Sequence, residues 1–501
     1  MKKISVILVL VLMLNPFIVY AKVNNAGFEG GIHKNEMDYK KTKQYKEVIF
    51  LTGEPILLEG TVAIKIKDKR LQYKYELSSK DGQVTLERDI ELERIIDQSS
   101  HPSQIVEVNN ILDYDEEIVI KNGKNKTTYT LVDYQFHNST IDDCEPVVAF
   151  YSGNWVGTKT YSINKDEGQV VVEITGNIYG YDHYWGATET QKIHKDINYT
   201  LNSGDTTLEW SGYADIDVSF NRTKNIEYFE NAAYLSSFDG GYTLTEKEET
   251  IMEYKYNLPY LDKTEQEQER VVAKLRNKGN GVERFETHPT QKKMYIPKFE
   301  DIKGYWAEKD IKKLAGLQII DANNKYFGGN LPIERQEFAK WIAKAVNLVK
   351  EEKKPKRSYV KPEINPPVFS DVTRENPDYE YIKAIKEKGI MNGIGDNKFM
   401  PKGNLTRAQA VTIIIRALGI ERLAPNPPFT TRFRDDEKIP KWAKKAIYVA
   451  QQIGLAEGSP EGYFYPNDYM TRAEAAVFLN RFISYLQEDF KTYYRDMILG
   501  Y

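Results

Sequence analysis

Hydrophobic and polar residues alternate with a period of two along most of the first half of the chain. The same alternation recurs at residues 62–67 and 71–77, and Asp-Gly or Asn-Gly pairs separate such runs. Alternate residues of a strand face opposite sides of a sheet, so the pattern predicts half-buried strands. We therefore expect a β-rich region over residues 22–260, sandwich-like or barrel-like, as one domain or as two with a break near residue 140. The clearest run places these apolar residues on one parity: Leu208, Trp210, Ile216, Val218 and Phe220.

A period near 3.6 replaces this alternation in the last two-fifths of the chain. Three segments each carry an arginine followed by apolar residues four, seven and eleven positions later, which is one face of an amphipathic helix. A second periodic stretch precedes each arginine, across a loop that contains Gly or Pro. One such helix–loop–helix unit cannot cover its own apolar faces, so the three units are predicted to share a core. The arginines are Arg335, Arg407 and Arg472, and the aspartates near the start of each unit are Asp301, Asp371 and Asp435.

These segments resemble S-layer homology (SLH) domains over roughly residues 299–486. The resemblance rests on the openings FED, FSD and FRD, on YWAEKDI and KWAKKAI, and on IERQE, LTRAQ and MTRAE around the arginines. It implies an all-α bundle with a pseudo-threefold arrangement, whose inter-repeat grooves bind a pyruvylated or otherwise acidic secondary cell wall polysaccharide. The tripled arrangement looks like the noncovalent wall anchor of Gram-positive surface proteins. It therefore implies a secreted S-layer or S-layer-associated protein, with self-association in a surface layer left open.

Two repeats depart from the family pattern. Glu334 stands where the other repeats have threonine, and Gln318 stands where they have glycine, so the loop of the first repeat is expected to differ in geometry. The second repeat has Pro377 where the other two have Trp306 and Trp442. One of the grooves is therefore expected to bind more weakly.

The arginines are the main candidate ligand contacts. A cation in the first turn of a helix opposes the helix dipole, so each arginine requires a compensating anion. One possible anion is an internal carboxylate, such as one of the repeat aspartates. The other is an acidic ligand, held by the guanidinium and by the free amides at the helix start. The resemblance favours the ligand, and the two tryptophans are balanced between stacking on a sugar and closing the core. The predicted polysaccharide-binding residues are Arg335, Arg407, Arg472, Asp301, Asp371, Asp435, Trp306 and Trp442.

The remaining segments complete the expected organisation. Residues 1–21 combine Lys2 and Lys3 with an apolar run and small residues before Lys22, which is typical of a signal peptide and leaves no membrane span in the mature protein. A charged, helix-favouring composition predicts a helical and polar spacer. The expected boundaries are 261–298 for the spacer, 299–350, 367–422 and 430–486 for the repeats, 351–366 for a linker and 487–501 for a tail.

The sequence contains no recognisable catalytic motif. The six histidines lack the spacing of a metal site, and neither a nucleophile elbow nor a phosphate-binding glycine loop occurs. We therefore assign no catalytic residue, metal or cofactor, and predict that the protein is not an enzyme. The alternative is an anchored hydrolase with unrecognised carboxylates in the N-terminal half. The net charge is −4, from 69 basic and 73 acidic residues, so the protein has no overall positive charge that would attract nucleic acid.

One aromatic-rich stretch in the β region is a candidate surface feature. Residues 179–185 read YGYDHYW, and flat amphipathic rings can stack on a sugar or on another protein. The competing interpretation is an aromatic hairpin that packs on its own sheet, and we favour that one.

Overall fold

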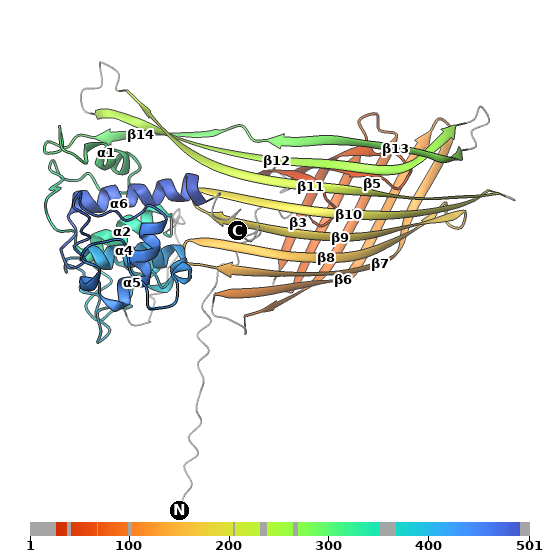
Figure 1. The fold of residues 1–501 in the computed structure, drawn as a ribbon. Coiled ribbons are helices and arrows are strands. Elements are labelled where there is room, and N and C mark those ends of the chain that lie inside the picture. The colour runs from red at the N-terminus through yellow and green to blue at the C-terminus, as the bar shows by residue number, and fades with distance from the viewer. Residues whose placement is uncertain are drawn as a thin grey trace, which may run out of the picture.

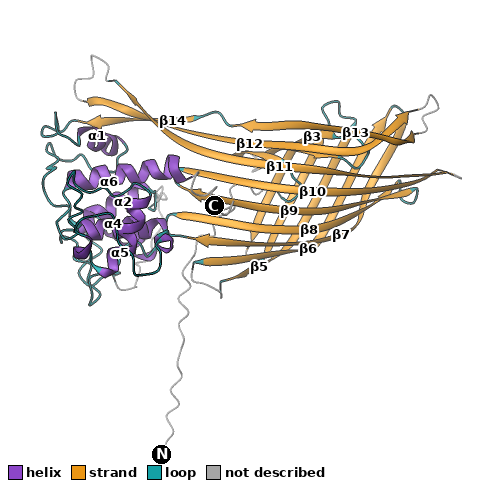
Figure 2. Ribbon diagram, viewed as in Figure 1, coloured by secondary structure: helices purple, strands orange, loops and turns teal. Residues whose placement is uncertain are grey.

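The protein folds into a long curved sheet with a helical bundle against one end (Figure 1). Strands and helices are segregated between the two parts, as Figure 2 shows. The computed structural model describes residues 27–37, 42–67, 69–98, 103–203, 206–230, 238–263, 269–349 and 367–490. The predicted signal peptide, the whole predicted linker and most of the predicted tail lie outside these residues.

The sheet is antiparallel and follows the chain in order. Within the described residues, β1 to β13 each pair with the next strand, and β14 pairs with β12 beside β13. The bounds are β1 (Ile32–Met37), β2 (Thr42–Ile49), β3 (Ile56–Lys67), β4 (Arg70–Ser78), β5 (Val84–Asp97), β6 (Gln104–Asn122), β7 (Asn125–Cys144), β8 (Val148–Ile163), β9 (Gly168–His183), β10 (Gly186–Ser203), β11 (Thr206–Phe229), β12 (Phe238–Lys263), β13 (Glu269–Glu286) and β14 (Thr290–Pro297).

The sheet curves until β1 contacts β12 and β13, so it forms a nearly closed barrel. Alternation of buried and exposed residues drives this shape, because the apolar face of each strand turns inward. Trp155, Tyr73 and Ile216 are at most 2% exposed in the interior cluster. The predicted β-rich, barrel-like region is therefore confirmed. The suggested break near residue 140 does not appear, since β7 pairs with β8 along its length.

The barrel interior also holds a network of buried charges that the sequence analysis did not identify. Arg88 contacts Glu47 at 2.8 Å and Glu116 at 2.9 Å, and Lys159 contacts Glu116 at 2.8 Å and Glu29 at 2.6 Å. Burial alone would raise the pKa of Glu116, but Arg88 and Lys159 outweigh it and hold this pKa below its usual value. These charges are therefore compensated inside the barrel.

The predicted helical spacer is wrong. Residues expected to form a helix belong to β13, which pairs with the second half of β12, and β14 pairs with the first half of β12. Helix propensity is a weak preference, and the backbone hydrogen bonds offered by the long β12 outweigh it here. The chain thus reaches the helical bundle directly from a strand of the sheet.

The C-terminal region contains the three predicted helix pairs, in the described residues. The second helix of each repeat packs on the first helix of the next: α2 on α3, α4 on α5, and α6 back on α1. The bounds are α1 (Glu308–Gly316), α2 (Arg335–Ala345), α3 (Tyr379–Glu387), α4 (Arg407–Leu418), α5 (Lys441–Gln452) and α6 (Arg472–Ser484), with short helical turns at Glu421–Leu423, Asp436–Lys438 and Tyr485–Asp489.

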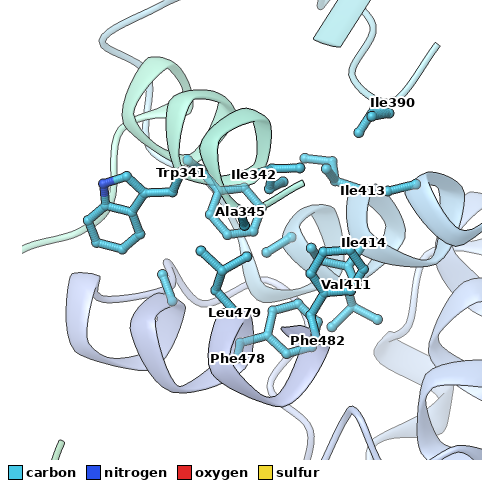
Figure 3. Packing of buried hydrophobic residues seen from close by; sticks show 14 of the residues in the cluster. Trp341, Ile342, Ala345, Ile390, Val411, Ile413, Ile414, Phe478, Leu479 and Phe482 are labelled. Atoms are coloured by element: carbon cyan, nitrogen blue, oxygen red, sulfur yellow. The ribbon is translucent and has the colours of Figure 1, made fainter. Parts of the chain in front are cut away.

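A ring of backbone hydrogen bonds joins the repeats at the centre. The amide of Ile333 donates to the carbonyl oxygen of Met470 at 2.9 Å, and Met470 donates to Leu405 at 2.9 Å. Leu405 donates to Ile333 at 3.2 Å, which closes the ring. The predicted all-α bundle with a pseudo-threefold arrangement is therefore confirmed. Its core includes Trp341 and Phe482, which pack between the second helices (Figure 3).

The loop of the first repeat keeps the geometry of the other two. Gln318 has a φ of 61°, close to 67° at Gly389 and 72° at Gly454, its counterparts in the other two repeats. The expected difference is therefore wrong at this residue, because Gln318 accepts the left-handed conformation that glycine adopts more readily. Glu334 does differ as expected in one respect, since it makes no side-chain cap on α2.

An apolar interface joins the barrel to the bundle. The Trp185 Nε1–H donates to the carbonyl oxygen of Ala345 at 2.9 Å, and the amide of Val147 donates to Ala417 at 3.2 Å. The ring of Tyr181 lies 5.0 Å from that of Phe490. The aromatic stretch 179–185 therefore packs on the helical bundle. This stretch is therefore neither an exposed binding surface nor a hairpin that packs only on its own sheet. Its hydrogen-bond partner in the bundle lies 160 residues away in sequence.

Candidate functional site

The three arginines begin the second helices of the repeats. Thr406 caps α4 in a capping box with Gln409, and Thr471 caps α6 in the same way with Glu474. Each box satisfies two backbone amides that the helix start would otherwise leave free. The threonine and its Gln or Glu partner therefore start the helix in the second and third repeats.

The amides at these helix starts are not available to a ligand. The amide of Arg335 donates to Gly403 at 2.8 Å, and the amide of Arg407 donates to Asp468 at 2.9 Å. The amide of Arg472 donates to a carbonyl oxygen of the first repeat, that of Leu331, at 2.9 Å. Each helix start therefore docks on the loop of the next repeat. The expected anion site built from free helix amides is wrong for this reason.

The repeat aspartates hold these loops in shape. Asp371 accepts hydrogen bonds from the amides of Phe399 and Met400, both at 2.7 Å. Burial acts to raise the pKa of Asp371, but these two amides outweigh it and lower the pKa below its usual value. Asp301 and Asp435 accept the corresponding amide pairs in their own repeats. Among the described residues, no ion pair links these aspartates to the three arginines.

Two of the arginines pair instead with a glutamate of the next repeat. Arg407 Nη1 lies 3.0 Å from Glu474 Oε1, and Arg407 Nε donates to the carbonyl oxygen of Phe464 at 2.9 Å. Arg472 forms the equivalent ion pair with Glu337. An internal carboxylate does compensate these cations, as one alternative proposed, but it is not the aspartate. The signal in the sequence was the glutamate two residues after the arginine in repeats one and three.

Arg335 has no such partner. It is 6% exposed, donates from Nε to Phe399 O at 2.8 Å and from Nη2 to Asn392 O at 3.1 Å, and lies over the Phe399 ring at 5.0 Å. Within the described part of the chain, no carboxylate lies within ion-pair distance of this guanidinium. Burial lowers the pKa of Arg335, and the field of Asp371 opposes that shift. Its charge is therefore only partly compensated.

Both tryptophans lie on the surface. Trp306 is 62% exposed and Trp442 is 54% exposed, so neither closes the core. Trp306 lines an open hollow of about 250 Å³ between the second and third repeats. Arg407 and Arg481 line the same hollow, and Arg481 forms an ion pair with Glu457 at 2.7 Å.

This hollow has the chemistry of a carbohydrate site. An exposed indole ring offers a flat apolar face, while the surrounding arginines and glutamates offer hydrogen-bond donors and acceptors to hydroxyl groups. Sequence reasoning identified Trp306 and Arg407 here but missed Arg481, Glu457 and Glu474. The described residues contain no group of three or more His, Cys, Asp or Glu arranged to hold a metal ion.

Comparison with known families identifies the repeats. Residues 298–339, 368–411 and 432–476 each match the S-layer homology domain. The C-terminal region thus consists of three SLH domains, and the resemblance noted from the sequence is confirmed. Together with the surface proteins among its relatives, these domains define a secreted protein that is anchored at the cell surface. None of the helices in the described ranges has the length and apolar character needed to cross a membrane.

Individual relatives match the chain over about a third of its length. The exoglucanase XynX of Acetivibrio thermocellus is 30% identical over 183 residues, which are 36% of this chain and 16% of that protein. The amylopullulanase of Thermoanaerobacterium thermosulfurigenes is 29% identical over 187 residues, 37% of this chain and 9% of that protein. The surface-layer 125 kDa protein of Lysinibacillus sphaericus is 29% identical over 190 residues, 37% of this chain and 14% of that protein. The match therefore spans less than a fifth of each relative.

The prediction that the protein is not an enzyme has to be corrected. The relatives that share these repeats include an exoglucanase and an amylopullulanase as well as a surface-layer protein. SLH domains thus occur on enzymes and on surface-layer proteins alike. The absence of a familiar catalytic motif in the sequence is therefore no basis for excluding an enzyme.

Proposed function

We propose that the three SLH domains hold this protein noncovalently on an acidic secondary cell wall polysaccharide, with the barrel displayed outward as in an S-layer or S-layer-associated protein. The observation that carries this proposal is the hollow beside Trp306. An exposed tryptophan, two arginines and a volume of about 250 Å³ suit one or two sugar units. A pyruvylated sugar would add a carboxylate that a guanidinium binds well.

The two ends of the second helices support the outward display of the barrel. Arg335 and Arg407 stand at the N-terminal ends of α2 and α4, whereas Ala345 and Ala417, near the C-terminal ends, contact the barrel. A helix of 11 residues is about 16 Å long. The grooves and the barrel therefore lie at opposite ends of the bundle, so a bound polymer and the barrel do not compete for one surface.

A second candidate function is an anchored polysaccharide hydrolase, which the names of two relatives favour. A cavity in the barrel interior, lined by Glu47 and Glu116, measures about 30 Å³ and is too small for a sugar. A hydrolase would therefore need a site elsewhere on the protein. Release of reducing sugars from wall polysaccharide, xylan and starch by the purified protein would establish it.

Cosedimentation with cell walls tests the anchor. The purified full-length protein is mixed with sacculi that retain their secondary polymer and with sacculi from which the polymer has been removed by acid. We expect retention on the first and release from the second. Equal retention on both would contradict the proposal, because peptidoglycan rather than the polymer would then be the ligand.

A further inference from the structure

The three grooves between repeats are not electrostatically equivalent. We name each groove after the arginine at its helix start: the Arg335 groove between repeats one and two, the Arg407 groove between repeats two and three, and the Arg472 groove between repeats three and one. Arg335 and Arg407 bond the following repeat in the same way, whereas the Arg472 Nε has no hydrogen-bond partner among the described residues. Arg335 donates to Phe399 O and Asn392 O, as Arg407 donates to Phe464 O and, at 3.5 Å, to Glu457 O.

Two of the grooves neutralise their own cations. In the Arg407 groove, Arg407 pairs with Glu474 and Arg481 pairs with Glu457. In the Arg472 groove, Arg472 pairs with Glu337, and two lysines are held by two aspartates. The lysine contacts are Lys340 to Asp321 at 2.5 Å, Lys340 to Asp378 at 2.7 Å and Lys344 to Asp321 at 2.6 Å.

The Arg335 groove has the cations without these carboxylates. Gln409 stands two residues after Arg407, where the other repeats have Glu337 and Glu474. Asn392 stands in the loop position that Asp321 and Glu457 occupy in the other repeats. Arg416 is the counterpart of Arg481, and within the described residues neither it nor Arg335 has an ion-pair partner. Each groove also contains one repeat aspartate, which is Asp371 in the Arg335 groove. Because all three grooves have this charge, it does not remove the electrostatic difference between them.

An exposed aromatic ring completes the Arg335 groove. Trp306 lies just before α1, which packs on α6, and this packing brings Trp306 over the Arg407 groove. Trp442 belongs to α5, which packs on α4 in the same manner. The repeat symmetry therefore places Trp442 beside Arg416. In the Arg472 groove the corresponding residue would come from repeat two, where Pro377 replaces the tryptophan.

We propose that the carboxylate-bearing sugar of the wall polymer binds in the Arg335 groove, paired with Arg335 and Arg416 and stacked on Trp442. This inference rests on the proposed function and adds which of the three grooves binds the acidic group. A buried guanidinium whose charge is only partly compensated gains most from a carboxylate, because no ion-pair partner has to be displaced. The Arg407 groove, already neutral, takes an uncharged part of the polymer. The Arg472 groove, neutral and without its tryptophan, contributes least.

Exchanging two neutral residues for the acids of the other grooves tests the assignment. Asn392→Glu and Gln409→Glu, made together in the full-length protein, give the Arg335 groove the carboxylates found at Glu457 and Glu474. The fold should tolerate them, because Glu474 already forms the same capping box as Gln409. We expect retention on polymer-bearing sacculi to weaken roughly ten- to a hundredfold, with a melting temperature that does not fall and a smaller effect of salt.

The matched control adds the same two charges on the barrel instead of in a groove. Gln83→Glu with Asn280→Glu, at exposed residues of the barrel, leaves all three grooves untouched, so it should not weaken binding. A pyruvylated hexosamine should compete with sacculi for the wild-type protein better than the same sugar without its carboxylate, and this preference should vanish in Asn392→Glu/Gln409→Glu. If the wild-type protein binds and this double variant binds equally well, the groove assignment is overturned while the anchor function stands. If the wild-type protein ignores the polymer, the proposed function itself fails.

Discussion

Glu474 connects two repeats through Arg407. One carboxylate oxygen of Glu474 lies 3.0 Å from Arg407 Nη1, and the other accepts the amide of Thr471 at 2.8 Å. One side chain thus caps its own helix and compensates a cation of the preceding repeat. The arginine that opposes the dipole of α4 is therefore stabilised by the helix start of α6.

This arrangement predicts that Arg407→Ala lowers stability. The substitution removes a partly buried ion pair and the hydrogen bond to Phe464 O at 2.9 Å, which we expect to cost about 1–2 kcal/mol of unfolding free energy. Chemical denaturation measures it. Arg407→Ala with Glu474→Gln should lose little more than Arg407→Ala alone, because the two residues act as a pair. Strictly additive losses would show that the ion pair carries no coupling energy.

The exposed tryptophans should affect binding and not folding. Trp306→Ala and Trp442→Ala remove rings that are 62% and 54% exposed, so the melting temperature should stay unchanged. Each loss of stacking is expected to cost about 1 kcal/mol of binding, which is roughly fivefold in affinity for sacculi. Trp341→Ala is the matched control, since Trp341 is 2% exposed in the core and its loss should cost about 3–5 kcal/mol of stability. Unchanged sacculus binding in both surface variants would remove the tryptophans from the site.

Local patterns allowed much of the fold and part of the site to be predicted. Strands were predicted from the period of two, and helices from the apolar spacing after Arg335, Arg407 and Arg472. Both patterns depend only on residues that are close in sequence. The capping boxes at Thr406 and Thr471 were readable for the same reason.

Long-range contacts could not be predicted in this way. The pairing of Arg472 with Glu337 joins residues 135 positions apart, and the contact of Trp185 with Ala345 spans 160 positions. The composition of the charged segment in β13 favours a helix. Composition contains no information on the pairing of this segment with β12, so the strand could not be predicted. Charges such as Arg88 and Glu116 likewise look solvated until the sheet closes over them.

The interface between barrel and bundle should make the two parts unfold together. Trp185→Ala removes the hydrogen bond to Ala345 and leaves a gap in the interface, so we expect a loss of about 3–4 kcal/mol and the separation of one thermal transition into two. Differential scanning calorimetry would record this. Tyr213→Ala, at a residue 38% exposed on the sheet, serves as the control and should keep a single transition. Two transitions already present in the wild-type protein would mean that the interface does not couple the parts.

The charges inside the barrel predict acid sensitivity. The pKa of Glu116 is lowered in the folded protein, because Arg88 and Lys159 outweigh the opposing effect of burial. A carboxylate with a depressed folded pKa contributes stability above its unfolded pKa of about 4.3, and this contribution is lost as the pH falls toward the folded value. Unfolding free energies measured from pH 7 to pH 2 should therefore decrease below about pH 4.5. Glu116→Gln should lower stability at pH 7 by about 3–5 kcal/mol, since it leaves buried cations under-compensated, and should flatten the acid dependence. Glu117→Gln, at the next position on the opposite, exposed face of β6, should change neither quantity. An acid profile in Glu116→Gln as steep as that of the wild-type protein would show that other carboxylates control the transition.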